Sequence, residues 1–150
     1  MDSTPLAAAV GDTSWADLIK SHERQIRQIT DSHGGSVVKF LGDGSMLAFE
    51  SAREAVRAAV GIRKSTPEES FGLRIGIHTG EVVRTGDDLY GMTVNKAARV
   101  ASAAKAGQIM ITSTTRDLVG SMEGIAFGQP TNVALKGLPD THQIIPIEAL

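Results

Sequence analysis

Apolar residues recur at helical spacing in two segments of the chain. The first segment, residues 12–33, precedes the Gly34-Gly35 stop and predicts a helix of about five turns; its apolar positions are Trp15, Leu18, Ile19, Ile26 and Ile29. In the second, Ser51 and Glu54 have the spacing of a capping box in front of an apolar stripe that reaches Ile62. A second helix is therefore predicted to begin there and to end near the polar loop 64–70.

Alternating apolar residues predict the strands. Residues 36–40 and 45–49 predict a hairpin, joined through a turn that glycines permit. Residues 72–83 predict a half-buried strand, a turn at Thr79-Gly80 and a second strand after it. Further strands are predicted at 108–112 and 142–150, on either side of a short capped helix at 113–121.

The segment 88–107 is rich in alanine and valine and predicts another helix. The resulting order, α-β-β-α-β-β-α-β-α-β, predicts an α+β sandwich with helices packed on one face of a mainly antiparallel sheet. A fold of this kind usually begins with a strand, but residues 1–10 have the composition of a poor one.

Composition narrows the classes of protein. A length of 150 residues with 41% hydrophobic residues predicts a single domain, 1–150. The 15 basic and 17 acidic residues give a net charge of -2 without a Lys/Arg run, so nucleic acid is not expected as a partner. The chain has no cysteine, no basic targeting region and no long apolar window, which predicts a cytoplasmic protein without a membrane segment.

Two places could carry chemistry. Asp43 lies between two glycines at the predicted hairpin tip, where it either makes the turn or offers a hard oxygen ligand to Mg²⁺ or Mn²⁺. Lys39 precedes it by four residues, so the two side chains share a face if the strand extends that far; otherwise Lys39 is an exposed strand lysine.

The predicted helix 88–107 is the second place. Its small residues form one stripe that would let it lie close to the sheet; they are Val94, Ala97, Ala98, Ala101 and Ala104. Asn95, Arg99 and Ser102 form an adjacent stripe, which is either a solvated flank or the edge of a cleft. The four histidines have no metal-ligand spacing and no phosphate-binding loop motif is present, so any nucleotide would bind without a P-loop.

Four segments in order resemble the class III adenylate/guanylate cyclase catalytic domain over roughly residues 12–148. They are VVKFLGDGSMLAF, GLRIGIHTGEV, DLYGMTVNKAARVASAAKAGQIMIT and LKGL. The resemblance implies a ferredoxin-like, cyclase-type sandwich. It also implies a phosphorus-oxygen lyase of intracellular signalling that makes cyclic AMP and pyrophosphate from ATP.

The resemblance assigns roles to six residues. Lys39 and Asp88 match the pair that reads the purine, and a Lys/Asp pair resembles that of enzymes that prefer ATP. Asn95 matches the residue that orients the ribose, and Arg99 the one that stabilises the α-phosphate transition state. Asp43 matches the second of two metal-binding aspartates, and Lys136 in LKGL matches a triphosphate contact.

The resemblance also implies cofactors and a partner. Two divalent cations, Mg²⁺ or Mn²⁺, would assist attack of the ribose 3′-hydroxyl on the α-phosphate. In the family the metal aspartates come from one subunit and the purine, Asn and Arg groups from the other. A head-to-tail homodimer with interfacial sites is therefore implied, and a monomer is expected to be inactive.

One departure from the family leaves two functions open. The family domain opens with a central strand that ends in the first metal-binding aspartate, and residues 1–11 show neither. We therefore expect an N-terminally incomplete cyclase domain. Either the sequence starts late, or another segment fills the gap, or the domain is degenerate. The alternative to a cyclase is a non-catalytic cyclase-like module for dimerisation or nucleotide sensing.

Overall fold

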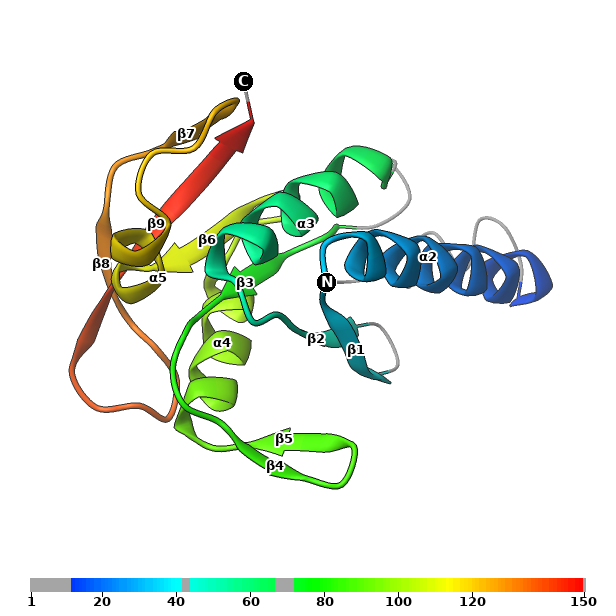
Figure 1. The fold of residues 1–150 in the computed structure, drawn as a ribbon, viewed down its shortest axis with the longest axis horizontal. Helices are drawn as coiled ribbons and strands as arrows, with labels where there is room; N and C mark the ends of the chain where they lie inside the picture. The colour runs from blue at the N-terminus through cyan, green and yellow to red at the C-terminus, as the bar shows by residue number, and fades with distance from the viewer. Residues whose placement is uncertain (1–11, 42–43, 67–71, 150) are drawn as a thin grey trace.

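The computed structural model describes residues 12–41, 44–66 and 72–149, and the side chains of 14–148 within those ranges (Figure 1). Its helices are α2 (Asp12–Ser32), α3 (Ala52–Ser65), α4 (Met92–Ala103) and α5 (Ser113–Val119). The predictions for α2, α3 and α5 are confirmed. No described helix is long and apolar enough to cross a lipid bilayer.

Five strands form the main sheet. They are β3 (Ile75–Ile77), β6 (Ile109–Thr112), β9 (Thr141–Ala149), β7 (Ile125–Phe127) and β8 (Thr131–Ala134). The hydrogen-bonded order is β3-β6-β9-β7, and β8 also pairs with β9. Only β3 and β6 run parallel, so the predicted mainly antiparallel α+β architecture is confirmed. The strands β7 and β8 were not predicted, because their runs of three and four residues show little periodicity.

Two hairpins lie outside the main sheet. The first, β1 (Ser36–Leu41) with β2 (Gly44–Ala48), is the predicted one. The second joins β4 (Val83–Thr85) to β5 (Asp88–Tyr90) through a turn at Gly86, which has a φ of +61°. The prediction of a helix from residue 88 was therefore wrong at its start.

Gly91 explains that error. Its φ of +120° is not helical, so a helix cannot run through this position, and α4 begins only after it. The strand predicted after Thr79-Gly80 exists as β4, but it pairs with β5 and not with the main sheet.

Both faces of the main sheet are covered by helices, which corrects the predicted single covered face. On one face, Ile109 and Ile111 of β6 pack with α3 and α5 through Val56 and Val119. On the other face, Met110 of the same strand packs in a second cluster with α4. All four residues of β6 are buried, as expected for a strand covered on both sides.

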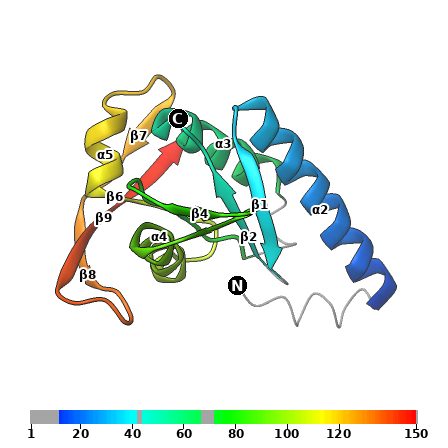
Figure 2. The same ribbon diagram turned by 60° about the horizontal axis from the view of Figure 1, so that its bottom comes forward.

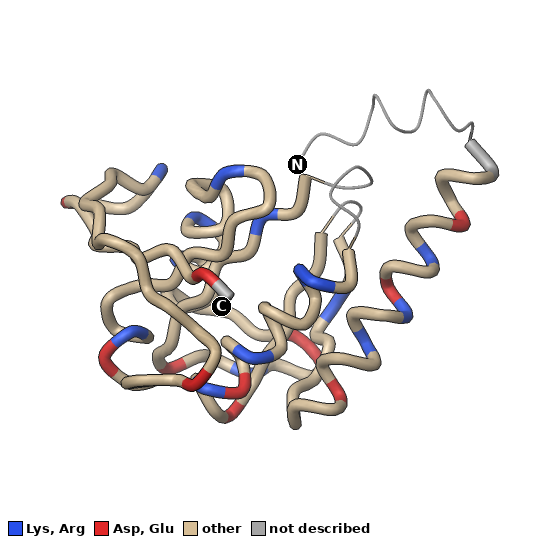
Figure 3. Tube along the Cα trace, turned by 90° about the horizontal axis from the view of Figure 1, so that it is seen from above, with Lys and Arg blue, Asp and Glu red and all other residues tan. Residues whose placement is uncertain are grey.

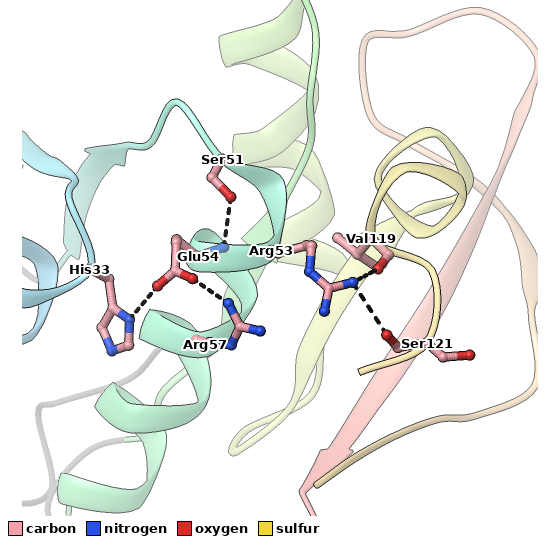
Figure 4. Close-up of polar contacts among 7 residues, drawn as sticks. All are labelled: His33, Ser51, Arg53, Glu54, Arg57, Val119 and Ser121. Carbon is pink, nitrogen blue, oxygen red and sulfur yellow. Dashed lines mark hydrogen bonds and ion pairs between the residues drawn. The ribbon is translucent and has the colours of Figure 1, made fainter. Parts of the chain in front are cut away.

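The first turn of α3 is held on both sides (Figure 4). The Ser51 hydroxyl accepts from the Glu54 backbone N–H at 3.2 Å, which confirms the predicted helix start. The Glu54 carboxylate contacts His33 Nδ1 at 2.9 Å and also Arg57, and the His33 contact is the main cause that lowers its pKa. Arg53 donates to the Val119 carbonyl at 2.5 Å. The end of α2 and the end of α5 are thereby tied to one turn of α3.

The hairpin β1–β2 lies between α2 and the β4–β5 hairpin in both ribbon views (Figures 1 and 2). Arg27 of α2 lies over the Phe40 ring of β1, 5.4 Å from its centroid, a cation–π contact. Acidic and basic residues are interspersed along the described chain (Figure 3).

Candidate functional site

Lys39 and Asp88, which are 49 residues apart in the sequence, form an ion pair. Lys39 Nζ donates to Asp88 Oδ2 at 3.0 Å, and the two side chains are 38% and 27% exposed. The other oxygen, Oδ1, accepts from the Leu89 backbone N–H at 2.8 Å. These two hydrogen bonds, the lysine's first, lower the pKa of Asp88. The structure therefore presents a cation and an ionised carboxylate side by side.

The backbone of β1 is irregular just before Lys39. Val37 pairs with Leu47, but Lys39 pairs with Met46, so Val38 is an extra residue in β1. Such a bulge rotates the residues that follow it and is common beside functional sites. Tertiary packing then brings β1 against β5, which carries Asp88.

Asn95 and Arg99 lie one turn apart on α4, as the sequence spacing predicted. Asn95 is exposed and Arg99 is half-buried. Arg99 Nε is shielded from solvent and has no hydrogen-bond partner among the described residues. A buried donor without a partner costs about 1–3 kcal/mol, so the fold holds this guanidinium at an energetic disadvantage. Ser102, predicted on the same stripe, instead donates to the Ala98 carbonyl within the helix at 3.2 Å.

Close packing on β3 positions α4. An ideal Cβ at Gly76 would lie 2.2 Å from the Ala101 backbone nitrogen and 2.7 Å from the Ala97 carbonyl oxygen. The helix and strand backbones are therefore in contact, as the small-residue stripe predicted. The prediction of that stripe was wrong at one position. Ala98 is exposed, and Val100 is instead fully buried in the second core cluster.

A groove of about 670 Å³, here called the central groove, lies beside these elements and is lined by residues of α2, β1, β2, α3, β3 and α4. Its described lining does not include the pair on β1 and β5 or the two polar residues of α4. No hydrogen bond or ion pair within the described part of the chain joins these two pairs.

Lys136 lies in a loop next to the core cluster that includes Val100 of α4. It is exposed in the loop after β8, between the buried Leu135 and the partly buried Leu138, which both pack in the second core cluster. The two leucines anchor the loop, and Gly137 between Lys136 and Leu138 has a φ of +80°.

The metal prediction is not tested by the structure. Asp43 lies outside the described residues. Within 12–41, 44–66 and 72–149, no three His, Cys, Asp or Glu side chains are grouped so that they could hold a metal ion. The described donors alone therefore do not fit a divalent cation, and Asp43 as a ligand stays a prediction.

A partly buried network of one histidine and three threonines was not recognised in the sequence. His78 Nδ1 lies 2.7 Å from Thr112 Oγ1, and Thr112 Oγ1 lies 3.2 Å from Thr115 Oγ1. Thr79 Oγ1 completes the chain at 3.0 Å from Thr115 Oγ1. Burial, followed by the nearby positive charge of Lys96, lowers the pKa of His78 to about 4. The only sequence signal was the helix-capping threonine at 112. His78 is half-buried, and its contact with Thr112 links the end of β3 to the start of α5.

Comparison with known proteins identifies one family over residues 1–146. The family model described as "Adenylate and Guanylate cyclase catalytic domain" matches residues 1–146. The uncharacterized protein Rv2212 of Mycobacterium tuberculosis is 32% identical over 136 residues, which cover 89% of this chain and 35% of that protein. Receptor-type adenylate cyclase B of Leishmania donovani is 27% identical over 99% of this chain and 15% of its own length. The chain thus spans about a third of the length of the first of these relatives.

The fold is also found among solved structures. An adenylate cyclase from Trypanosoma brucei, solved in its monomeric state, superposes with a TM-score of 0.83 at 24% identity, over 99% of this chain and 84% of that one. At this identity the likeness establishes the fold.

Proposed function

Because the chain belongs to the adenylate and guanylate cyclase catalytic domain family, we propose that it converts ATP to cyclic AMP and pyrophosphate. The observation that carries this proposal is the Lys39–Asp88 pair at 3.0 Å. An exposed ion pair of this kind contributes only about 0.2–1 kcal/mol to stability, so folding alone gives little reason to keep it. A donor and an acceptor held together at a surface suit recognition of a purine edge.

Adenine offers a matching edge. Its N1 accepts a hydrogen bond and its N6 amino group donates one, so the Lys39 ammonium and the Asp88 carboxylate can bind both. In the free protein each side chain is the other's partner, so both must turn toward the base when it binds. Guanine offers the opposite donor and acceptor at this edge, so neither Lys39 nor Asp88 could hydrogen-bond to it in the same orientation. A site built on such hydrogen bonds discriminates strongly against the base that lacks them.

In the proposed reaction the 3′-oxygen of the ribose attacks the α-phosphorus. The new O–P bond closes the cyclic phosphate, the bond to the β-phosphate oxygen breaks and pyrophosphate leaves, while the hydroxyl proton is lost. Asn95 orients the ribose, and the Arg99 guanidinium offsets the negative charge that builds up on the α-phosphate oxygens. The unpartnered, shielded Nε of Arg99 supports this role, because the guanidinium has no competing carboxylate in the described chain. Lys136 is proposed to contact the triphosphate.

The proposal includes two divalent cations, Mg²⁺ or Mn²⁺, with Asp43 as one ligand. In two-metal sites such ions neutralise phosphate charge and activate the attacking oxygen. Since the described residues do not form a metal-binding group, the cations rest on the family resemblance.

We place this site at the interface of a head-to-tail homodimer. Exposed apolar side chains beside Asp88 support an interface there, namely Val83, Tyr90 and Met92, which are 60%, 52% and 64% exposed. Val83 and Tyr90 face each other across the β4–β5 hairpin. An apolar surface next to a charged pair is typical of a protein interface.

The test is cyclic nucleotide production from ATP and from GTP with Mn²⁺. We expect cyclic AMP from ATP, and a loss of about 10²–10³-fold in kcat for Arg99→Ala, the usual cost of removing one transition-state donor. Arg24→Ala is the matched control, since Arg24 is exposed on α2. Formation of cyclic GMP from GTP, with no cyclic AMP from ATP, would refute the adenine assignment. Nucleotide binding without turnover would favour the non-catalytic module.

A further inference from the structure

The segment 78–80, which follows β3, is held by the four side chains here called the threonine network. Thr79 Oγ1 lies 3.0 Å from Thr115 Oγ1, which lies 3.2 Å from Thr112 Oγ1. Thr112 Oγ1 lies 2.7 Å from His78 Nδ1, so the contacts return to the segment from which they started. Both ends of the network are therefore neighbours in the sequence, and its middle belongs to the start of α5.

The middle of the threonine network is fully buried. Thr112 and Thr115 are 1% and 0% exposed. Thr112 Oγ1 also accepts from the Thr115 backbone N–H at 3.4 Å, which caps α5. Each hydroxyl has one proton to donate, so the loss of one hydroxyl leaves its buried neighbour without a partner. The network therefore ties the segment 78–80 to the first turn of α5.

The same segment supports the first turn of α4. An ideal Cβ at Gly80 would lie 2.6 Å from Thr93 Oγ1 and 3.4 Å from Thr93 Cγ2, so the Thr93 side chain packs against the Gly80 backbone. The N-cap of α4 is Gly91, which supplies no side-chain hydrogen bond to the free N–H groups of this turn. Contacts from outside the helix therefore have a larger share in placing it.

Asn95 lies between two supports of α4. Thr93 packs on Gly80 before it, and the Ala97 carbonyl lies against Gly76 after it. Gly76 belongs to β3, so the second support is fixed by the main sheet. A shift of Gly80 would therefore move the first support alone and turn the start of the helix, together with Asn95.

We infer that the threonine network positions Asn95 for the proposed reaction, because it fixes the segment against which the first turn of α4 packs. His78, Thr79, Thr112 and Thr115 are thus positioning residues that act through Asn95. Their role in turnover rests on the proposed cyclase function, whereas their hold on α4 follows from the contacts alone.

Hydrogen exchange in the first turn of α4 tests this hold without any nucleotide. Thr115→Val removes the central hydroxyl and keeps the branched shape, so exchange of the Asn95 and Lys96 amides should become about tenfold faster. Thr79→Val removes a hydroxyl at the less buried end of the network and should act in the same direction, which keeps the test independent of the folding of one variant. Thr115→Ser keeps the hydroxyl and should exchange as the parent does.

Thr30→Val is the matched control. Thr30 is also a fully buried threonine, but its Oγ1 has no hydrogen-bond partner among the described residues. Exchange in α4 should therefore be unchanged in this variant. Equal acceleration in Thr30→Val would mean that any buried Thr→Val change loosens the helix, whether or not it breaks the network.

Turnover of ATP with Mn²⁺ separates positioning from stability. Thr115→Val should lower kcat about 10–100-fold with little change in KM, since a misplacement of about 1 Å can cost about 10²-fold. Thr115→Ser should recover most of kcat. In an Asn95→Ala background Thr115→Val should have no further effect, because both changes act on one contact. A network that only stabilised the fold would lower kcat by the same factor in both backgrounds.

Three results would each overturn the inference: unchanged exchange in both Thr115→Val and Thr79→Val, equal acceleration in Thr30→Val, or equal losses of kcat in the two backgrounds. A parent protein without turnover would refute the proposed cyclase function instead. The exchange measurement would then still decide whether the threonine network holds α4.

Discussion

Gly76 of β3 is the position where one methyl group should move the helix that carries Asn95 and Arg99. Its ideal Cβ would lie 2.2 Å from the Ala101 nitrogen and 2.7 Å from both Ala101 Cα and the Ala97 carbonyl oxygen. All three are backbone atoms, so no side chain can rotate away. Gly76→Ala therefore forces α4 and β3 apart.

The size of the effect follows from these distances. Moving from 2.2 Å to an ordinary contact of 3.4 Å requires a shift of about 1.2 Å at the closest atom. Overpacking in a core typically costs about 1–3 kcal/mol. For a chain of 150 residues each kcal/mol lowers Tm by about 2–4 °C, so a decrease of about 2–12 °C is expected.

Gly61 in α3 provides the matched control. Its ideal Cβ would meet only Ile29 Cγ2 at 3.4 Å, an ordinary contact. Within a helix, Gly→Ala stabilises by about 0.5–1 kcal/mol because alanine loses less backbone entropy on folding. Gly61→Ala should therefore raise Tm slightly while Gly76→Ala lowers it.

Thermal unfolding followed by circular dichroism, supported by urea titration, measures both variants. A Gly76→Ala protein as stable as the parent would show that α4 does not lie against β3 as described. Equal losses in both variants would show that the response is not specific to that contact. Because α4 carries Asn95 and Arg99, the same substitution should also lower cyclase turnover.

Three further predictions concern charge. His78 has a folded pKa of about 4, below its ordinary 6.5, so the unfolded chain binds a proton at higher pH than the folded one. The free energy of unfolding should therefore fall as pH decreases from 6.5 to 4. In urea titrations at stepped pH, His78→Asn should flatten that slope. Glu54 has a lowered pKa, mainly through its hydrogen bond with His33. The stabilisation from its carboxylate is therefore present above pH 4.5 and is lost as pH falls through the lower folded pKa. Glu54→Gln should remove this loss of stability in acid, and an unchanged pH dependence in the variant would contradict the reasoning. A double-mutant cycle of Lys39→Ala and Asp88→Ala should give a coupling free energy of about 0.2–1 kcal/mol that decreases with salt, and a coupling that salt does not change would refute an exposed pair.

Local patterns predicted the elements whose signals lie within a few residues. The apolar spacing of α2, the serine cap of α3 and the alternation in the first hairpin all have local causes, and each is confirmed. The spacing of Asn95 and Arg99 on one helix belongs to the same class. The short strands β5, β7 and β8 were missed, because three or four residues carry too little periodicity and their pairing partners lie elsewhere in the chain.

In the candidate site, too, the residues could be named from sequence but their contacts could not. Family resemblance named Lys39 and Asp88, but local sequence contains nothing that would bring β1 against β5. The bulge at Val38 and the turn at Gly91 also depend on pairing and packing around them. Asp43 lies outside the described residues, so its role as a metal ligand is still a prediction from sequence.

The strongly periodic helices and strands, the family and the residue types available for chemistry can all be read from the amino-acid sequence, since they depend on local spacing and side-chain identity. Three features follow from tertiary packing alone: both sheet faces are covered, Lys39 lies 3.0 Å from Asp88, and β2 and β3 border one groove. The physical reason is that such contacts join residues distant in the chain. Their free energy depends on the simultaneous packing of several elements, which no local pattern encodes.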